Sequence, residues 1–423
     1  MNPAPSNIDV LTTADGVSLK VGLQRSLRKR KRTALLLVAP LFLFILLTFL
    51  GPIFDMLLRS VDNKVTQDTL PTTVQLLSEW DDTTGELPDE AIFKAFVIDG
   101  KNIGKAINRL GKRLNYERSG MSSLFRKTAR TLRKLDPEST GMSYKEAVLG
   151  IDKKWHDVDV WRLLKRESGA KTASYYYAAF DAKRDASGLH FKPENQQIYL
   201  KLFARTMWLA SLITALTVLL GYPIAFLLAT LKTRTSNLLM ILVLLPFWTS
   251  LLVRTSAWIA LLQKEGVIND FLVGLNIISD ENRLSMIHNQ TGTIIAMTHI
   301  LLPFMILPLF SVMKTIPPSY MRAARSMGAT PFTAFRRVYF PNTVAGIGAG
   351  GILVFILSIG FYITPALVGG TDGTMISNFI AYHISSSLNW GLAAALGTML
   401  LMLVLALYIL YDKVVGIDNM KFG

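Results

Sequence analysis

The chain has 423 residues and no cysteine, 51% of its residues are hydrophobic, and 45 Lys and Arg against 30 Asp and Glu give a net charge of +15. The mean hydropathy of +0.35 is too high for a soluble protein of this size, although 18% of the residues are charged. The absence of cysteine excludes disulfides, thiolate metal sites and cysteine nucleophiles. We therefore expect a protein that is part membrane and part aqueous.

Six apolar stretches are long enough to cross a bilayer as helices. A span needs about 20 apolar residues, because a helix rises about 1.5 Å per residue and the hydrocarbon core is about 30 Å thick. The stretches are 34–54, 203–230, 237–262, 292–313, 343–369 and 391–411. The first follows the basic block RSLRKRKR, and we interpret it as a retained anchor, because the apolar region of a cleaved signal peptide is shorter.

The positive charge in the short connections predicts the orientation of the spans. Lys and Arg are concentrated in the N-terminal tail (1–33) and in the connections between the second and third and between the fourth and fifth stretches. The connection between the fifth and sixth stretches has neither residue. We therefore expect both termini in the cytoplasm, with 412–423 as the C-terminal tail.

Residues 55–202 form a long polar segment that this topology places outside the cytoplasm, because long loops cross a membrane largely regardless of charge. Apolar residues recur at near-helical spacing at Leu124, Ala129 and Leu132, and again between Trp155 and Leu164. We expect an all-α membrane protein with six transmembrane helices and a large, mostly helical extracytoplasmic insertion between the first two. Basic helices in that location are typical of a solvated face or a docking surface, so we predict no nucleic-acid partner.

The connection between the fourth and fifth stretches, 314–342, carries the most informative pattern. A helical pattern over 319–327 ends at Gly328, which can adopt a turn conformation that most residues avoid. The adjacent Ala323 and Ala324 would let a partner surface approach closely. The pattern favours a docking element, and an ordinary amphipathic cytoplasmic loop is the alternative.

This connection resembles the EAA loop of type I ABC import permeases. The likeness rests on Ala323, Ala324, Gly328, Ala329, Phe335, Val338, Pro341, Gly346 and Ile347. In that family the loop is a coupling helix that sits in a cleft of the cytoplasmic ATPase, so the resemblance implies this role for the residues from Arg322 to Pro341. Arg322 stands where the family has glutamate, and Ala345 stands where it has proline. The first departure replaces an acidic contact to the ATPase with a basic one.

Two further stretches narrow the resemblance. LLPFWTSLLVRTSAWIALL (244–262) is similar to the third-span signature of the spermidine/putrescine branch, the PotB-like permeases, and GFYITPALVGG (360–370) to the fifth-span signature of related polyamine and opine permeases. The resemblance covers 34–54 and 203–411. It implies a multi-pass permease in the bacterial inner membrane, in contact with lipid, that works with a second homologous permease, an ABC ATPase dimer and an extracytoplasmic solute-binding protein. It carries over no role for 55–202.

Residues of the third and fifth stretches are compatible with a solute path. Arg254 lies well inside a span, where a charge costs at least about 2.5 to 3.5 kcal/mol unless it faces water or a partner, so we expect it to face the bundle interior. The candidate path residues are Trp248, Thr249, Arg254, Trp258, Phe361, Tyr362 and Thr364. Aromatic faces attract cations and hydroxyls can replace lost hydration, which suits a polyamine. Interfacial or packing roles are the alternative for Trp248 and Trp258, and Arg254 would repel a polycation unless an acid neutralised it.

No motif supports an enzymatic function. GKNIGK at 100–105 is one residue too short for a phosphate loop, the five histidines lack metal-ligand spacing, and no GxSxG elbow occurs. We predict no catalytic residue, metal or cofactor, and we expect ATP hydrolysis on a partner chain. The predicted function is the permease subunit of an ABC importer for polyamines (putrescine or spermidine) or similar small amine-containing solutes.

Two alternatives stay open. The first changes only the cargo, to an opine, an amino-acid conjugate, thiamine or an anionic solute neutralised by Arg254. The second is a ligand-gated channel or sensor whose 55–202 segment detects a ligand. A channel or sensor would respond without any ATPase, whereas an importer requires one.

Overall fold

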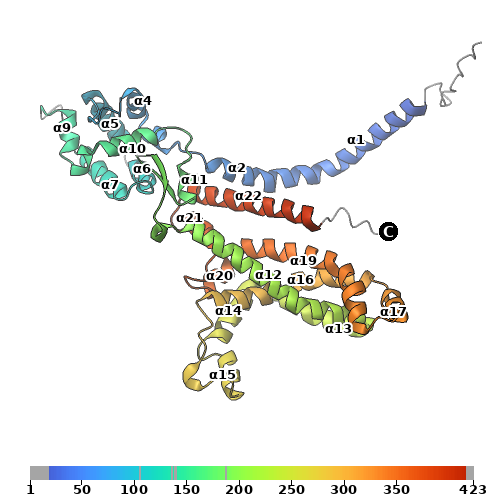
Figure 1. Ribbon diagram of the computed structural model, residues 1–423. Helices are drawn as coiled ribbons and strands as arrows, with labels where there is room; N and C mark the ends of the chain where they lie inside the picture. The colour runs from blue at the N-terminus through green and yellow to red at the C-terminus, as the bar shows by residue number, and fades with distance from the viewer. Residues whose placement is uncertain (1–18, 104–105, 135–136, 138–140, 186–187, 416–423) are drawn as a thin grey trace, which may run out of the picture. The chain divides into compact units, whose positions relative to one another are not determined.

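The computed structural model describes residues 19–103, 106–134, 137, 141–185 and 188–415. In this part of the chain the structure is helical, apart from one two-stranded antiparallel sheet and the connecting turns (Figure 1). The chain forms two units, Met1–Leu58 and Arg59–Gly423. By length and composition, five of the described helices can cross a membrane, or six if one sharply bent pair of helices counts as a single span.

The first unit is one long apolar helix. It consists of α1 (Leu19–Ile45), a π-helical stretch (Leu46–Leu50) and α2 (Gly51–Arg59), of which Ser26–Arg59 is long and apolar enough to be a span. The helix extends beyond the predicted 34–54 at both ends, because the preceding basic block consists largely of good helix formers. Residues 1–18 of the predicted tail lie outside the described part of the chain.

Residues 59–198 form a helical segment with its own hydrophobic core. Its elements are α3 (Val65–Thr69), α4 (Pro71–Glu79), α5 (Glu90–Ile103), α6 (Ile107–Asn115), α7 (Met121–Leu132), α9 (Tyr144–Leu149), a 3-10 turn (Lys153–His156), α10 (Val158–Arg166), α11 (Ser174–Ala179), β1 (Ala182–Asp185), β2 (Gly188–Phe191) and a second 3-10 turn (Glu194–Gln196). The antiparallel β1–β2 hairpin is absent from the predicted all-α fold, because strands of four residues are too short to show an alternating pattern.

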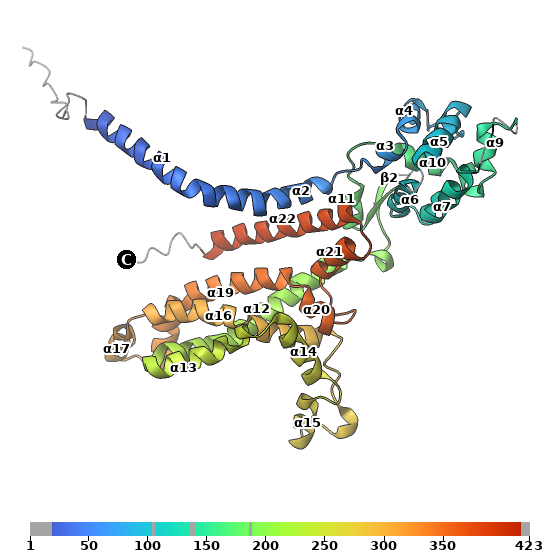
Figure 2. The same ribbon diagram turned by 180° about the vertical axis from the view of Figure 1, so that it is seen from behind.

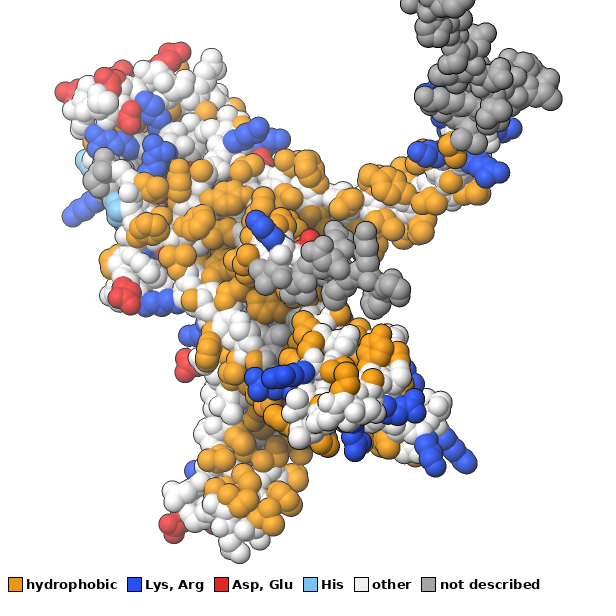
Figure 3. All heavy atoms as spheres, turned by 45° about the vertical axis from the view of Figure 1, so that its right-hand side comes forward, with side chains coloured by type: hydrophobic (Ala, Val, Ile, Leu, Met, Phe, Trp, Pro, Cys, Tyr) orange, Lys and Arg blue, Asp and Glu red, His pale blue; other side chains and the backbone are white. Residues whose placement is uncertain are grey.

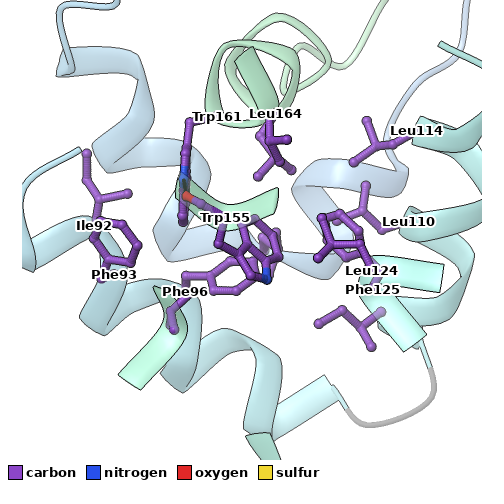
Figure 4. Close-up of a cluster of buried hydrophobic side chains, with 14 of the residues drawn as sticks. Ile92, Phe93, Phe96, Leu110, Leu114, Leu124, Phe125, Trp155, Trp161 and Leu164 are labelled. Carbon is purple, nitrogen blue, oxygen red and sulfur yellow. Dashed lines mark hydrogen bonds between the residues drawn. The ribbon is translucent and has the colours of Figure 1, made fainter. Parts of the chain in front are cut away.

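Five aromatic rings form the centre of this core. Phe93, Phe96, Phe125, Trp155 and Trp161 contact one another at centroid separations of 4.7 to 6.4 Å (Figure 4). The Trp155 Nε1–H donates to the Thr128 hydroxyl at 3.0 Å and the Trp161 Nε1–H to the Trp155 carbonyl oxygen at 3.1 Å. Both indole N–H groups are therefore satisfied inside the core, which removes the cost of burying them.

Within the 59–198 segment, backbone hydrogen bonds pair residues 61–63 with residues 170–172. The Asn63 N–H donates to the Ala170 carbonyl oxygen and the Thr172 N–H to the Val61 carbonyl oxygen, each at 2.9 Å. These bonds flank an antiparallel bridge between Asp62 and Lys171. The chain therefore enters and exits the 63–170 block at two adjacent backbone positions.

The remainder of the second unit holds the long apolar helices. Its elements are α12 (Tyr199–Thr230), α13 (Thr233–Leu244), a 3-10 turn (Leu245–Trp248), α14 (Leu251–Leu262), α15 (Val267–Gly274), a 3-10 turn (Asp280–Asn282), α16 (Gln290–Thr315), α17 (Pro318–Ser326), α18 (Pro331–Ala334), a π-helical stretch (Phe335–Tyr339), α19 (Phe340–Gly360), α20 (Ile363–Val368), α21 (Ile376–Ser385) and α22 (Trp390–Val415). Helices α12, α16 and α19 pack side by side (Figures 1 and 2). Figure 3 shows hydrophobic side chains over the visible faces of the long helices. The predicted tail 412–423 is helical to Val415, and its last eight residues lie outside the described part.

The third predicted span, 237–262, is bent and not continuous. Thr233–Trp248 and Leu251–Gly274 meet at 95°. Pro246 lies in the intervening turn, and the Ser250 hydroxyl accepts the Val253 N–H at 3.2 Å, so a new helix starts there. The sequence pattern did not reveal the bend, because the residues on both sides of the turn are equally apolar, and the bent pair still counts as a sixth candidate span.

The fifth predicted span, 343–369, breaks near its end. α19 ends at Gly360, and α20 begins at Ile363. The Ser377 hydroxyl donates to the Phe361 carbonyl oxygen and the Asn378 amide to the Tyr362 carbonyl oxygen, each at 2.7 Å. Ser377 thus satisfies the Phe361 carbonyl group, which Pro365 cannot pair because it has no N–H, as apolar surroundings require. The Tyr362 carbonyl oxygen also accepts the Ala366 N–H at 3.0 Å.

Glycine lets α16 and α19 approach closely. A Cβ placed on Gly350 would lie 2.8 Å from Met305 Sδ and 3.1 Å from the Met305 carbonyl oxygen. Small residues at such contacts are typical of helix packing in membranes. On the next residue, a Cβ placed on Gly351 would meet only Thr214 Cγ2, at 3.9 Å.

Gly350→Val is therefore expected to lower the yield of folded protein. Overpacking of a close helix contact costs about 1 to 3 kcal/mol, and backbone atoms of Met305 cannot move aside as a flexible side chain can. The measurement is the monodisperse fraction of the detergent-solubilised chain in size-exclusion chromatography. Gly351→Val is the matched control, because it changes the same residue type in the same helix. Equal losses in the two variants would contradict the packing argument.

Candidate functional site

α17 and α18 form a compact turn of two short helices between α16 and α19, which we call the knuckle (residues 317–339). α17 (Pro318–Ser326) lies close to the predicted helical pattern at 319–327, and α18 (Pro331–Ala334) follows it. Gly328, between them, has a φ of +88°, in the left-handed region that favours glycine. The Thr330 hydroxyl caps α18 by accepting the Thr333 N–H at 3.2 Å. The predicted loop 314–342 is shorter in the structure, because Pro331–Gly360 is continuous enough to be one candidate span.

The predicted coupling residues divide into two groups in the structure. Arg322, Ala323, Gly328 and Pro341 are exposed, whereas Ala324 is buried, and Ala329 and Phe335 are half-buried. The Phe335 ring contacts the rings of Tyr222, Phe226 and Tyr339 at centroid distances of 6.2, 5.8 and 5.7 Å. The buried group therefore fixes the knuckle to the bundle, and the exposed group is available to a partner.

Two exposed apolar side chains of the knuckle were not predicted. Met327 is 82% exposed and Phe332 is 72% exposed, and they flank the turn that contains Gly328. Large apolar side chains of this kind are typical anchors of protein interfaces. The sequence could have indicated their exposure, because Met327 and Phe332 lie on either side of the helix break and belong to no apolar face of a helix.

The charge around these anchors has one sign. Five exposed cations lie in the connection: Lys314, Arg322, Arg325, Arg336 and Arg337. No Asp or Glu occurs anywhere in 314–342. The knuckle thus presents apolar tips inside a basic surround, which suits a partner surface that has an apolar groove and acidic edges.

The bend between α13 and α14 brings together part of the predicted path. Arg254 is half-buried on α14, and its guanidinium carbon lies 5.8 Å from the centroid of the Phe247 ring. Arg254 Nε is buried and has no hydrogen-bond partner among the described residues. The Phe247 ring contacts Phe304 at 5.0 Å. In the described structure the Arg254 guanidinium therefore lies beside the Phe247 ring and not beside a carboxylate.

Two polar contacts join α14 to its neighbours beside Arg254. The Trp258 Nε1–H donates to His299 Nδ1 at 3.2 Å, and their rings are 5.2 Å apart. The Thr255 and Thr364 hydroxyls are 3.2 Å apart, and both side chains are fully buried. Thr255 and His299 were not predicted as path residues, because their partners are distant in the sequence.

The other predicted path residues are more peripheral. Trp248 is 75% exposed and Tyr362 is 47% exposed, and Thr249 is also exposed, with its hydroxyl donating to the Pro246 carbonyl oxygen at 2.8 Å. Phe361 is half-buried. The structure therefore groups Arg254, Trp258 and Thr364 near the contacts of α14 with α16 and α20, and it leaves Trp248 on the surface.

Comparisons with known proteins match the apolar part of the chain. The family described as "Binding-protein-dependent transport system inner membrane component" matches residues 221–415. The chain is 32% identical over 246 residues to the spermidine/putrescine transport system permease protein PotB of Haemophilus influenzae, covering 56% of this chain and 85% of that protein. It is 30% identical over 224 residues to PotB of Escherichia coli, covering 53% and 81%.

Further similarities are of the same kind. The inner membrane ABC transporter permease protein YdcU of Escherichia coli is 33% identical over 236 residues, covering 53% of this chain and 74% of that protein. Among solved structures, a chain of a bacterial alginate ABC transporter in complex with an alginate pentasaccharide-bound periplasmic protein has a TM-score of 0.43 and 16% identity, covering 53% of this chain and 80% of that chain.

These relatives are transport permease subunits and not enzymes. The predicted absence of a catalytic function and the predicted kind of protein are therefore confirmed. The similarity to PotB also confirms the resemblance to PotB-like permeases that was inferred from residues 244–262 and 360–370. The chain belongs to the binding-protein-dependent inner membrane components, the PotB-like permease subunits of type I ABC importers.

Proposed function

We propose that this permease carries polyamines (putrescine or spermidine) or similar small amine-containing solutes into the cell. Several relatives are named spermidine/putrescine permeases, which supports this cargo. In the proposed complex the chain pairs with a second homologous permease, two ABC ATPase subunits and an extracytoplasmic binding protein. Both termini lie in the cytoplasm, and residues 55–202 lie outside.

The exposed knuckle is the observation that carries the coupling part of the proposal. Its apolar tips, Met327 and Phe332, are largely exposed in the chain alone and have a basic surround. When ATP closes the ATPase dimer, motion of the knuckle would be transmitted through Phe335 to the rings of Tyr222 and Phe226 on α12. The spans would then tilt and open the path outward, where the binding protein releases the solute.

The path itself would hold an amine weakly. Trp258 offers a half-buried aromatic ring to a cation, whereas the Phe247 ring is already in contact with Arg254. The Thr255 and Thr364 hydroxyls are buried against each other, so they would contact a solute only when α14 and α20 move apart. Arg254 has no carboxylate partner in the described structure, so its charge disfavours a long stay of a second cation nearby. A permeation site must release its cargo as well as bind it. In this proposal the extracytoplasmic binding protein therefore binds the solute tightly, and the permease only lets it cross the membrane.

Purification followed by an uptake assay tests this function. The tagged chain is extracted from its native membrane in mild detergent, and the co-purifying proteins are identified. A phosphate-loop ATPase and a second permease of similar size are expected, and the reconstituted complex should take up labelled putrescine or spermidine only when ATP is supplied. Recovery of the chain alone would contradict the importer, and uptake of an opine or thiamine in place of both polyamines would contradict the cargo.

A tag inserted at Lys134, an exposed residue of the 59–198 segment, is expected to react only with reagents outside the cell. The reason is the proposed topology, in which the basic short connections stay in the cytoplasm. The measurement is labelling of the tag in intact and permeabilised spheroplasts. A tag at Arg234, an exposed residue in the first turn of α13, is the control and should react only after permeabilisation. Cytoplasm-only labelling at Lys134 would overturn the topology.

A further inference from the structure

The 59–198 segment contains a polar cavity that the transport function does not use. It has a volume of about 640 Å³ and lies between α10, the end of α6 and strand β1. Its size is within the range of small-molecule sites. Six of its lining residues are cations, namely Arg118, Arg162, Lys165, Arg166, Lys183 and Arg184.

The cations outnumber the carboxylates around this cavity. The lining contains three carboxylates, Asp82, Glu117 and Asp159. Behind the lining, Asp157 pairs with Arg118, and Glu167 pairs with Arg166 and with Arg113. Counted with Arg113, seven cations face five carboxylates among the side chains that the structure describes, a surplus of positive charge.

Several of these cations are held in place by oxygen atoms of the protein. Arg162 donates through Nε and Nη2 to the Asp82 carbonyl oxygen at 2.9 and 2.8 Å. Lys165 donates to an Asp82 carboxylate oxygen at 2.8 Å, and this hydrogen bond lowers the pKa of Asp82, so the pair stays charged at neutral pH. Arg166 donates through Nη1 to the Arg184 carbonyl oxygen at 2.8 Å. The cationic lining is thus preorganised before any ligand arrives.

Two cations of the lining have no carboxylate partner among the described side chains. Lys183 and Arg184 are exposed on β1, and neither side chain makes an ion pair with another described residue. They add two free charges to a cavity whose own carboxylates are already paired. Guanidinium and ammonium groups in this arrangement match the oxygens of carboxylate and phosphate groups.

We propose that this cavity binds a small multivalent anion, a molecule that carries two or more carboxylate or phosphate charges. The ligand differs from the proposed cargo in the sign of its charge and occupies a different part of the chain. The site would make the 59–198 segment a ligand-binding part of the permease. It stands independently of which solute the spans carry.

The test uses the full chain in nanodiscs with citrate and inorganic phosphate as probes at constant ionic strength. Each probe is expected to raise the thermal unfolding midpoint in a saturable way, whereas chloride at the same ionic strength should not, because a bound ligand stabilises the folded state by mass action. Lys183→Glu combined with Arg184→Glu is expected to weaken binding at least tenfold. Arg130→Glu combined with Arg133→Glu, at exposed positions at the C-terminal end of α7 and just after it, makes the same charge change outside the cavity lining and should leave binding unchanged.

Three outcomes would overturn the proposal. They are the absence of a saturable shift with either probe, an equal loss in the control variant, and an equal shift with chloride at the same ionic strength. If the charge reversals fail to fold, Lys183→Gln with Arg184→Gln provides the comparison, with the same expected loss. Polyamine uptake is measured separately, so failure of this site leaves the proposed transport function untouched.

Discussion

Replacing both exposed anchors of the knuckle, as Met327→Ala with Phe332→Ala, is expected to abolish ATP-driven uptake. The two side chains are 82% and 72% exposed, so their truncation removes little packing within the chain. In the proposed complex they are buried against the ATPase, and truncation of such an anchor costs about 2 kcal/mol. A loss of this size for each anchor corresponds to about a 30-fold weaker docking per side chain. Uptake and recovery of the ATPase with the purified permease are the two measurements.

A matched variant distinguishes docking from a general loss of stability. Met402→Ala with Leu405→Ala removes two apolar side chains that are 63% and 46% exposed on α22, far along the chain from the knuckle. This control is expected to keep both uptake and the bound ATPase. If the knuckle variant transports at the normal rate, the coupling role of 317–339 is wrong.

Trp155→Ala is expected to have the largest effect on stability. Trp155 is fully buried, contacts Phe96, Phe125 and Trp161, and donates a hydrogen bond to Thr128. Truncation of a buried aromatic residue to alanine destabilises a fold by about 3 to 5 kcal/mol. This is a large part of the stability of a small helical segment, so residues 59–198 should become sensitive to protease while the apolar helices remain protected.

Limited proteolysis of the solubilised full chain measures this effect. Trp208→Ala is the control, because Trp208 is 61% exposed on α12 and its loss leaves no cavity in a core. Cleavage rates within 59–198 should rise in the first variant only. Resistance of the Trp155→Ala chain would mean that the aromatic cluster contributes little to the segment.

Composition was sufficient to predict most of the membrane helices. A run of about 20 apolar residues has few alternatives to a span, so the stretches near α12, α16 and α22 were located within a few residues. The first helix of the knuckle and its end at Gly328 were also predicted, because glycine has a strong local preference for the left-handed turn found there. These features depend on residues that are close in the sequence.

Features that depend on distant residues were not predicted. The bend before α14 leaves the apolar composition unchanged on both sides, and only the Ser250 cap and Pro246 mark it. The contacts of Trp258 with His299 and of Thr255 with Thr364 join residues 41 and 109 positions apart. The cationic cavity likewise gathers residues from Asp82 to Arg184. None of these has a signature within a single stretch of sequence.

The backbone pairing between residues 61–63 and 170–172 affects how such a chain can change. Because Asn63 is hydrogen-bonded to Ala170 and Thr172 to Val61, the backbone positions that flank residues 63–170 are already neighbours. A block of this kind can be excised and its ends rejoined by a short turn, without displacing the helices on either side. Residues 63–170 are therefore a cassette, which evolution or protein engineering can exchange while the transport core is retained.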